Sequence, residues 1–458
     1  MTTSQPQLKR AMGTPTLLMF GIAYMVPLTI FSTYGLVNDI TGGRLPLAYI
    51  VTTIAMLFTA LSYASIVRRL PTAGSAYGYA RQAFGPGVGF VTGWGLMVDY
   101  MLLPMLNYMF IGLYVNSQFP AVPVWLVIVL AIAVVTVLNV IGIEVVRNIN
   151  VLLVAFQVLF LVFFVILAFG HFSGDANPAA PFSFAPDFST VVAGSAILAL
   201  SFLGFDAVST LAEEAKDARR TVPRAVLLTV LVGGVMFVFV SWVGYMVWPD
   251  YTTFENLDTA PNELFGLVGG AGLQAFFLAA YIVGCVASAL SSQASTSRVL
   301  YSMGRDRLLP QGVFGKLNAR FQTPVNAILV IAVVSLLALV LPLDTVISVV
   351  SFGALAAFSM VNLAVIKFFL IDAKLRGAKA IFLYGVLPLI GFALTVWLWF
   401  SLSAEALIVG LVWVAIGVIY LAVISRGFRR IPKSTIDTQA ILNTETAMLS
   451  QVEGREHM

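Results

Sequence analysis

Long apolar stretches separated by short polar connections run along nearly the whole chain. Many of them exceed the ~20 residues that an α-helix needs to cross the hydrocarbon core of a bilayer. Breaks at prolines, glycines and charged clusters divide the pattern into twelve predicted spans. We place the spans at 16–37, 45–66, 87–115, 122–142, 147–170, 189–213, 223–248, 270–299, 325–342, 344–370, 381–402 and 404–426. The pattern predicts an all-α membrane protein.

Composition agrees with this prediction. The 458 residues are 60% hydrophobic and 10% charged, whereas an ordinary soluble domain has about 25% charged residues. The first apolar stretch is long enough to span and no small-residue cleavage site follows it, so we expect a retained helix and not a cleaved signal peptide. From residue 427 onward the chain is polar without an apolar period, and we expect a disordered tail.

The basic residues predict the orientation, because cytoplasmic connections of membrane proteins are enriched in lysine and arginine. Most bases fall in or beside alternate connections: Arg68, Arg69, Arg81, Arg147, Lys216, Arg219, Arg220, Arg224, Arg298, Arg305, Arg307, Lys316, Arg320, Lys374, Arg376 and Lys379. The opposite connections carry mainly acids: Asp39, Asp175, Asp187, Asp250, Glu255, Asp258, Glu263, Asp344 and Glu405, with Arg44 as the only base. We therefore expect both termini in the cytoplasm.

Two predicted spans contain helix breakers at membrane depth. The first span has Gly21 and Pro27, and the sixth has Gly204 two residues before Asp206. Proline removes a backbone donor and frees a carbonyl one turn earlier. A simple kink is the usual consequence of one such residue. Broken helices at equivalent places in two halves of a chain indicate a transporter site, and spans one and six have the spacing that an inverted 5+5 repeat requires.

Two carboxylates lie inside predicted spans. Asp206 follows the break of the sixth span, and Asp99 lies about half-way through the third. A charge at the bilayer centre costs roughly 3 kcal/mol on insertion scales, so such an acid usually faces a partner, a cavity or a transported solute. For Asp99 a structural carboxyl bonded to a neighbouring helix is an equal alternative. A substrate amine or a proton would supply the missing positive charge.

Other residues near the breaks complete the predicted binding site. Tyr24 and Tyr100 could offer a hydroxyl or an aromatic face to a cation, although tyrosines in spans are commonly packing residues. Ser32 lies just beyond the first break and could donate a hydrogen bond, but small hydroxyls often bond to their own helix. Phe205 is placed in the site beside Asp206. Gln157 is a polar residue of the fifth span, and its alternative role is a helix-to-helix hydrogen bond.

Charged residues end the sixth span. Glu213 and Glu214 are followed by Lys216, Asp217, Arg219 and Arg220. By default this segment is a solvated charged turn. The alternative is that Glu213 and Glu214 take part in coupling or form an inner gate.

The residue inventory argues against an enzyme. The chain has one cysteine and two histidines, which leaves little for a metal site or a Ser-His-Asp site. No Gly-Lys-Ser/Thr phosphate-binding loop is present, so nucleotide hydrolysis is not the expected energy source. We expect no cofactor, no metal and no nucleic-acid partner; the expected partners are a small amine, a coupling proton and the lipid bilayer.

Three sequence blocks carry a resemblance to a known family. They are RLPTAGSAYGYARQAFGP at 69–86, GFDAVSTLAEEAKDARRTVPRA at 204–225, and SRVLYSMGRDRLLP at 297–310 with TPVNA at 323–327. With these blocks the chain resembles the amino acid–polyamine–organocation superfamily of secondary transporters. The resemblance implies a LeuT-type ten-helix core at 16–370 and two peripheral helices at 381–426. The charge and polar patterns add a cytoplasmic segment at 1–15 and a disordered cytoplasmic tail at 427–458.

Within that superfamily the chain is most similar to bacterial putrescine importers. The resemblance implies that Tyr100 and the acids of span six bind the amine. Three departures bear on the solute and its coupling. Met25, Val26 and Pro27 replace a Gly-x-Gly carboxylate nest of amino acid carriers, Ser32 replaces an aspartate of the putrescine importers, and Gln157 occupies the place of a lysine found in proton-coupled relatives.

The sequence therefore predicts a secondary transporter of the bacterial inner membrane that imports a small organic amine together with protons by alternating access. An amino acid permease or an exchanger is the nearest alternative. A channel and a membrane-embedded enzyme are further alternatives, which saturable flux and chemically unchanged solute would exclude.

Overall fold

The computed structural model describes residues 11–72, 74–184, 188–255, 257, 260–402 and 404–425. The predicted tail at 427–458 and most of the predicted amino-terminal segment lie outside these residues. The described residues form helices and loops; the only β-type pairing among them is one isolated bridge between Met12 and Ala215. The fold class is thus all-α, as the apolar pattern predicts.

The helices of the first half follow the predicted spans closely. They are α1 Thr14–Met25, the 3-10 helix η1 Pro27–Ser32, α2 Tyr34–Thr41, α3 Leu45–Arg69, α4 Ser75–Phe84, α5 Pro86–Gln118, α6 Val124–Ile141, α7 Ile143–Ala168, η2 Phe169–His171, η3 Ala180–Phe182, α8 Phe188–Leu198, η4 Ala199–Phe202 and η5 Ala207–Glu214. The predicted first and sixth spans are each divided into several helical pieces.

The second half has one very long helix and several short ones. Its elements are α9 Ala218–Val247, η6 Tyr251–Thr253, α10 Ala260–Arg305, α11 Gln311–Phe314, α12 Val325–Ser335, η7 Leu336–Leu339, α13 Leu343–Ile366, the π-helix η8 Lys367–Asp372, α14 Ala378–Ile381, the π-helix η9 Phe382–Val386, α15 Leu387–Phe400 and α16 Ala404–Ile424. α10 has non-helical backbone at Gly270, where the predicted eighth span begins.

Eleven helices in the described part of the chain are long and apolar enough to cross a membrane. The predicted ninth span corresponds to the apolar helix Val325–Leu339, which is shorter than the others. Large apolar side chains of the last two helices are exposed, as expected for a surface that contacts lipid. They include Leu389, Trp397, Phe400, Ile408, Leu411, Ile419 and Val423.

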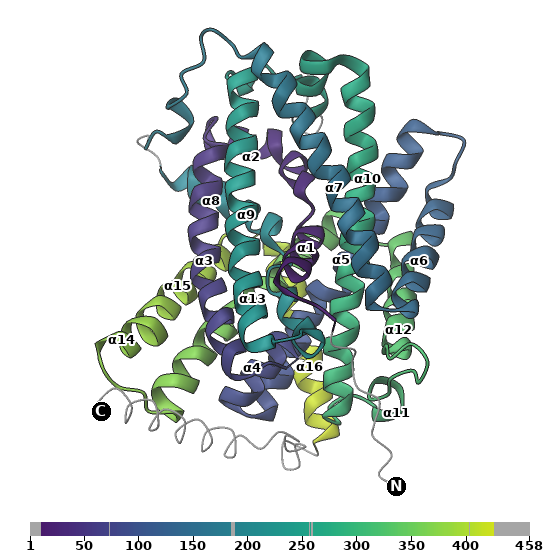
Figure 1. Cartoon of the computed structure of the whole chain (residues 1–458), viewed down its shortest axis with the longest axis vertical. Coiled ribbons are helices and arrows are strands. Elements are labelled where there is room, and N and C mark those ends of the chain that lie inside the picture. The colour runs from purple at the N-terminus through teal and green to yellow at the C-terminus, as the bar shows by residue number, and fades with distance from the viewer. Residues whose placement is uncertain are drawn as a thin grey trace.

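The pieces of the first span lie in the middle of the bundle (Figure 1). α1 packs against α7, α9 and α10, while α3 packs along α9, and α5 packs against both α10 and α13. α4 and α11 lie at one end of the molecule, and α2 lies toward the other (Figure 1). The broken first span is therefore enclosed by long neighbouring helices.

The first helix breaks at Val26. This residue has φ 55° and ψ 98°, in the left-handed range that a β-branched residue rarely adopts. The following Pro27 disfavours helical backbone at Val26 and lacks an N–H. The chain continues as a 3-10 helix, whose Thr29 N–H donates to the Val26 carbonyl at 2.8 Å. The sequence around Pro27 accounts for this break.

The sixth span breaks between Phe202 and Ala207. Leu203 is extended with ψ 129°, and Gly204 has φ 116°. A Cβ on Gly204 would lie 2.6 Å from Cβ and Cγ of Tyr24, so only glycine fits against the first break. The two breaks thus touch each other, which places Asp206 at their junction.

Candidate functional site

Asp206 is buried at this junction, with 1% of its surface exposed. The Tyr100 hydroxyl on α5 donates to its Oδ2 at 2.6 Å, and the Gly204 N–H donates to its Oδ1 at 3.3 Å. The break of the sixth span therefore supplies both the carboxylate and one of its donors. Hydrogen bonds to a charged oxygen stabilise the ionised form.

Asp99 is the second buried acid, also 1% exposed. Its Oδ1 atom has no hydrogen-bond partner. Its Cβ faces α13 at Gly353, where an added Cβ would lie 3.2 Å from it. The expected bond from a neighbouring helix to this oxygen is therefore not formed.

Neither acid has a basic partner among the residues that the structure describes. In the part of the chain that the structure describes, no ion pair joins Asp99 or Asp206 to a lysine or arginine. A buried charge without a counter-ion is costly. The described residues therefore leave both buried acids without a counter-ion.

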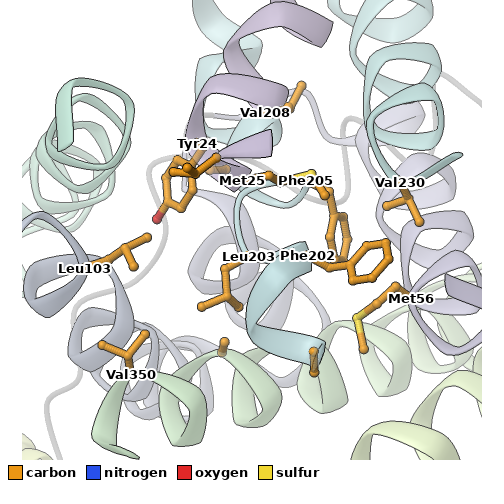
Figure 2. Close-up of a cluster of buried hydrophobic side chains, with 14 of the residues drawn as sticks. Tyr24, Met25, Met56, Leu103, Phe202, Leu203, Phe205, Val208, Val230 and Val350 are labelled. Atoms are coloured by element: carbon orange, nitrogen blue, oxygen red, sulfur yellow. The ribbon is translucent and has the colours of Figure 1, made fainter. Parts of the chain in front are cut away.

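Tyr24 closes over the site from the first break. Its ring centroid lies 6.3 Å from that of Tyr100, and its buried hydroxyl has no hydrogen-bond partner. Figure 2 shows this hydroxyl directed toward Leu103 of α5, with Leu203 of the sixth-span break nearby. The Asp206 carboxylate thus lies near two tyrosine rings and one phenol oxygen without a hydrogen bond. Aromatic faces and oxygen acceptors are both suited to binding an ammonium group.

A polar face of α10 holds the first break in place. The Ser288 hydroxyl donates to the Tyr24 carbonyl at 2.9 Å, and Asn107 of α5 donates to Ser288 Oγ at 3.0 Å. Further along, Thr296 donates to the Tyr100 carbonyl at 2.6 Å. These side chains satisfy backbone oxygens that would otherwise be buried without partners.

The sequence prediction missed these residues. Their signal was a run of eight small or polar residues at 291–298 and Ser288 just before it, inside an otherwise apolar helix. All of these side chains are buried. A helix face with so many polar residues does not suit contact with lipid. It indicates hydrogen bonds to neighbouring helices.

Two predicted site residues contact side chains other than Asp206. Ser32 is exposed, and its hydroxyl forms a 2.8 Å hydrogen bond with that of Tyr281 on α10. Phe205 is buried, and its ring packs against those of Tyr63 and Phe358 at 5.8 and 5.0 Å between centroids. Phe205 therefore anchors the break to α3 and α13.

Gln157 is fully buried on α7. The alternative role, a helix-to-helix hydrogen bond, is not seen: its Nε2 donates weakly to its own helix at Leu153, 3.4 Å away, and its Oε1 has no partner. The amide lies against Gly284 of α10, where a Cβ would be 2.6 Å from Oε1. Gly284 therefore leaves space for the Gln157 amide but forms no hydrogen bond with it.

The expectation of a solvated charged turn after span six is wrong for Glu213 and Glu214. Glu214 is buried in an ion pair with Arg298, and Glu213 accepts two bonds from Arg305 at 3.0 and 3.1 Å. Arg298 and Arg305 are seven residues apart on α10, a spacing that puts both on one helix face. The acids were correctly located at the end of the span, but their partners are distant in sequence.

The amino-terminal segment is hydrogen-bonded to the end of the sixth span. The N–H groups of Ala11 and Met12 donate to the Glu214 carbonyl at 2.9 and 3.1 Å, and the Lys216 N–H donates to the Met12 carbonyl at 2.9 Å. On the other side of the first break, the Phe31 ring packs at 4.8 Å from Phe265. Ion pairs and backbone hydrogen bonds thus lie at the end of the sixth span, and aromatic packing lies beyond the first break.

Comparison with known proteins agrees with this architecture. The model of the family described as "Amino acid permease" matches residues 16–438. The chain belongs to the amino acid permease family. It is therefore a multi-pass membrane protein of a transporter family, and the resemblance seen in its sequence is confirmed.

Several curated members of the family are similar over nearly their full length. The chain is 37% identical over 435 residues to the low-affinity putrescine importer PlaP of Escherichia coli, covering 93% of this chain and 96% of that protein. It is 26% identical to the branched-chain amino acid permease BcaP of Bacillus subtilis, with 93% and 95% covered. It is 25% identical to the methylthioribose transporter of Bacillus subtilis, with 92% and 94% covered.

Proposed function

We propose that this amino acid permease family member imports a small organic amine, with putrescine or a related monoamine as the substrate. The observation that carries the proposal is the buried Asp206 carboxylate between two helix breaks. It is hydrogen-bonded to Tyr100 and has no basic partner among the described residues. An ammonium group would supply the missing charge, and the similarity to a putrescine importer supports the same solute class.

The first break argues for an amine over an α-amino acid. Free backbone N–H donors at a helix break are one way to bind the carboxylate of an amino acid. Pro27 has none, and the N–H of Thr29 is bonded to the Val26 carbonyl. An amino acid permease or an exchanger remains the second candidate, because BcaP of the same family is named for branched-chain amino acids.

The proposed architecture has twelve transmembrane helices, with the short helix Val325–Leu339 as the ninth. Spans one to ten form an inverted 5+5 repeat, and the two breaks occupy equivalent positions in its halves. Both termini are cytoplasmic, in the bacterial inner membrane, because basic residues cluster at the α4 and α11 end. Rocking of the repeat about Asp206 gives alternating access, and the ion pairs and aromatic packing described above correspond to an occluded state.

We propose protons as the coupling ion. Gln157 cannot titrate, and Glu213 is held by Arg305. Asp99 and Asp206 are the remaining embedded acids of the predicted site. Asp99 has an unpartnered buried oxygen, which a bound proton would make less costly to bury. We assign proton carriage to Asp99 and amine binding to Asp206.

Uptake by the purified protein in proteoliposomes tests the function. We expect saturable accumulation of radiolabelled putrescine that is stimulated by an inward proton gradient, and chromatography should recover the solute unchanged. Unlabelled leucine should compete poorly. Transport of leucine with no transport of any amine would overturn the amine assignment. Flux that does not saturate with solute would indicate a channel. Chemical conversion of the labelled solute would indicate an enzyme.

A further inference from the structure

A deep apolar groove lies between α5, α13, α15 and α16. Its volume is about 490 Å³, a size typical of sites that bind a small molecule. None of its lining residues is charged. All four helices belong to segments that are long and apolar enough to cross a membrane, so the groove lies at membrane depth.

The floor of the groove is at Gly95 of α5. This residue is buried, yet a Cβ added to it would have no other atom within 4 Å. Protein interiors rarely leave such space unfilled. Next to this space the backbones of α5 and α13 touch, because a Cβ on Gly353 would lie 2.8 Å from the Gly95 carbonyl oxygen and 2.9 Å from the Asp99 nitrogen. The groove therefore reaches the helix contact beside the buried Asp99.

One stripe of α16 holds this helix against the bundle. Trp413 and Trp94 of α5 exchange two hydrogen bonds, each Nε1–H donating to the carbonyl of the other residue, at 2.7 and 2.9 Å. Gly410 lies against the ring of Phe352 on α13, where an added Cβ would be 2.2 Å from Cγ. Gly417 lies against the ring of Trp94 in the same way, with Cδ1 at 2.3 Å. These contacts fix α16 close to both α5 and α13.

The adjacent stripe of α16 borders the groove and leaves it open. Leu411, Val414 and Leu421 line the groove, and their spacing of three and seven residues puts them on one face of the helix. At the rim, Leu411 is 54% exposed and Val88 of α5 is 40% exposed. In a bilayer these rim residues face lipid, so an acyl chain has a lateral entrance to the groove.

The shape and chemistry of the groove favour one occupant. A helix of a second copy is about 10 Å wide with its side chains, so it would rest on the rim without reaching Gly95. Residues 427–458 of this chain are polar without an apolar period, which does not suit an uncharged groove. A hydrocarbon chain is narrow, flexible and uncharged, and the bilayer supplies it at high concentration.

We propose that the groove is a binding site for an acyl chain of a membrane phospholipid. The bound chain packs against Gly95 of α5, Ala356 of α13 and Val414 of α16. It fills the space beside the Trp94–Trp413 contact and thereby joins α16 to the α5–α13 contact next to Asp99. The site is separate from Asp206 and does not rest on the proposed substrate.

Quenching of tryptophan fluorescence by brominated lipid tests the site, because bromine quenches an indole that it touches and Trp399 lines the groove. The parent protein is the full chain with Trp125→Phe and Trp397→Phe, which removes two exposed tryptophans. It is reconstituted in phosphatidylcholine with ordinary or with dibrominated acyl chains. The Trp399 signal is the difference between this parent and the same protein with Trp399→Phe. We expect the dibrominated chains to lower that signal at least twofold.

Filling the groove should prevent this quenching. Gly95→Leu places a side chain in the open space on α5, and Ala356→Leu narrows the groove from α13. The two variants come from different helices, so the test does not depend on one of them folding. In each, the quenching of Trp399 should fall to less than half of that in the parent. Gly272→Leu, at an exposed glycine of α10 with open space around it, is the matched control and should keep the quenching of the parent.

Three results would overturn the inference. Absence of Trp399 quenching in the parent would show that no acyl chain enters the groove. Equal quenching in the parent and in a filled variant with an unchanged unfolding midpoint would show that the bromines act from outside the groove. Quenching that appears only at a low ratio of protein to lipid would show that a second copy covers the groove.

Discussion

At the residue scale, the site depends on how Asp206 is held. Its two oxygens have different donors: Tyr100 bonds one and the Gly204 N–H bonds the other. The Tyr100 bond is the shorter, at 2.6 Å, and comes from a helix outside the break. Tyr100 therefore orients the carboxylate from α5.

Tyr100→Phe should weaken amine binding about tenfold while leaving the protein folded. The variant removes a hydrogen bond to a charged oxygen, a contact worth about 1.5–3 kcal/mol, but keeps the ring. The measurement is putrescine affinity from calorimetric titration of the purified protein. Tyr108→Phe is the matched control, because its buried hydroxyl has no partner to lose. Equal affinity in Tyr100→Phe and wild type would show that this bond does not act on the substrate.

At the element scale, residues close in sequence cause the helix breaks, whereas the side chains that hold the breaks in place come from distant parts of the chain. Pro27 and Gly204 are visible in the sequence, and the backbone leaves the helix at Val26 and between Leu203 and Asp206. Most helix ends also lie within a few residues of the prediction, because apolar length and charge determine them. Each of these features depends on residues that are close in sequence.

The contacts that support the breaks join residues far apart in the chain. Ser288 bonds the carbonyl of Tyr24 across 264 positions, and Arg298 pairs with Glu214 across 84. Apolar periodicity carries no information about such pairs. The sequence could therefore place Glu214 at the end of its span but could not show that it is buried and paired.

Gly204→Ala should lower both stability and transport. Backbone with φ 116° costs about 1–3 kcal/mol for a residue with a side chain, and the added Cβ would press on Tyr24. We expect a lower unfolding midpoint and at least a tenfold drop in putrescine uptake. Gly170→Ala has open space around it and should change neither. Unchanged uptake in Gly204→Ala would contradict the close contact between the breaks.

Ser288→Ala should impair turnover more than binding. The variant frees the Tyr24 carbonyl but leaves Asp206 and Tyr100 in place. We therefore expect kcat for uptake to fall several-fold with a smaller change in KM, and Asn107→Ala, which removes the donor to Ser288, should behave alike. A rise in KM alone would place Ser288 in substrate contact. Ser288→Thr keeps the hydroxyl and should rescue turnover.

At the scale of the whole molecule, the proposed alternating-access mechanism requires the two ends of the molecule to open in turn. One end is closed by ion pairs between η5 and α10 and by the amino-terminal segment, and the other by aromatic packing around Phe31. The ion pairs are polar and the rings are apolar. The two ends therefore differ in chemistry. Opening one end breaks ion pairs, whereas opening the other separates aromatic rings.

Asp99→Asn should uncouple the proposed proton movement from amine movement. The amide keeps the shape of the side chain but cannot carry a proton. We expect loss of gradient-driven accumulation of putrescine with retained exchange of internal for external putrescine. Both are measured in proteoliposomes of matched protein content. Accumulation at the wild-type level would exclude Asp99 as the proton carrier.

The most direct test of the account is the charge at Asp206. Asp206→Asn keeps the size of the side chain and its ability to accept from Tyr100, so the protein should reach the membrane and unfold at a similar temperature. Binding of putrescine to the purified variant, measured by calorimetric titration, should fall at least a hundredfold because the ammonium group loses its counter-charge. Wild-type affinity in this variant would contradict the central claim that Asp206 binds the transported amine.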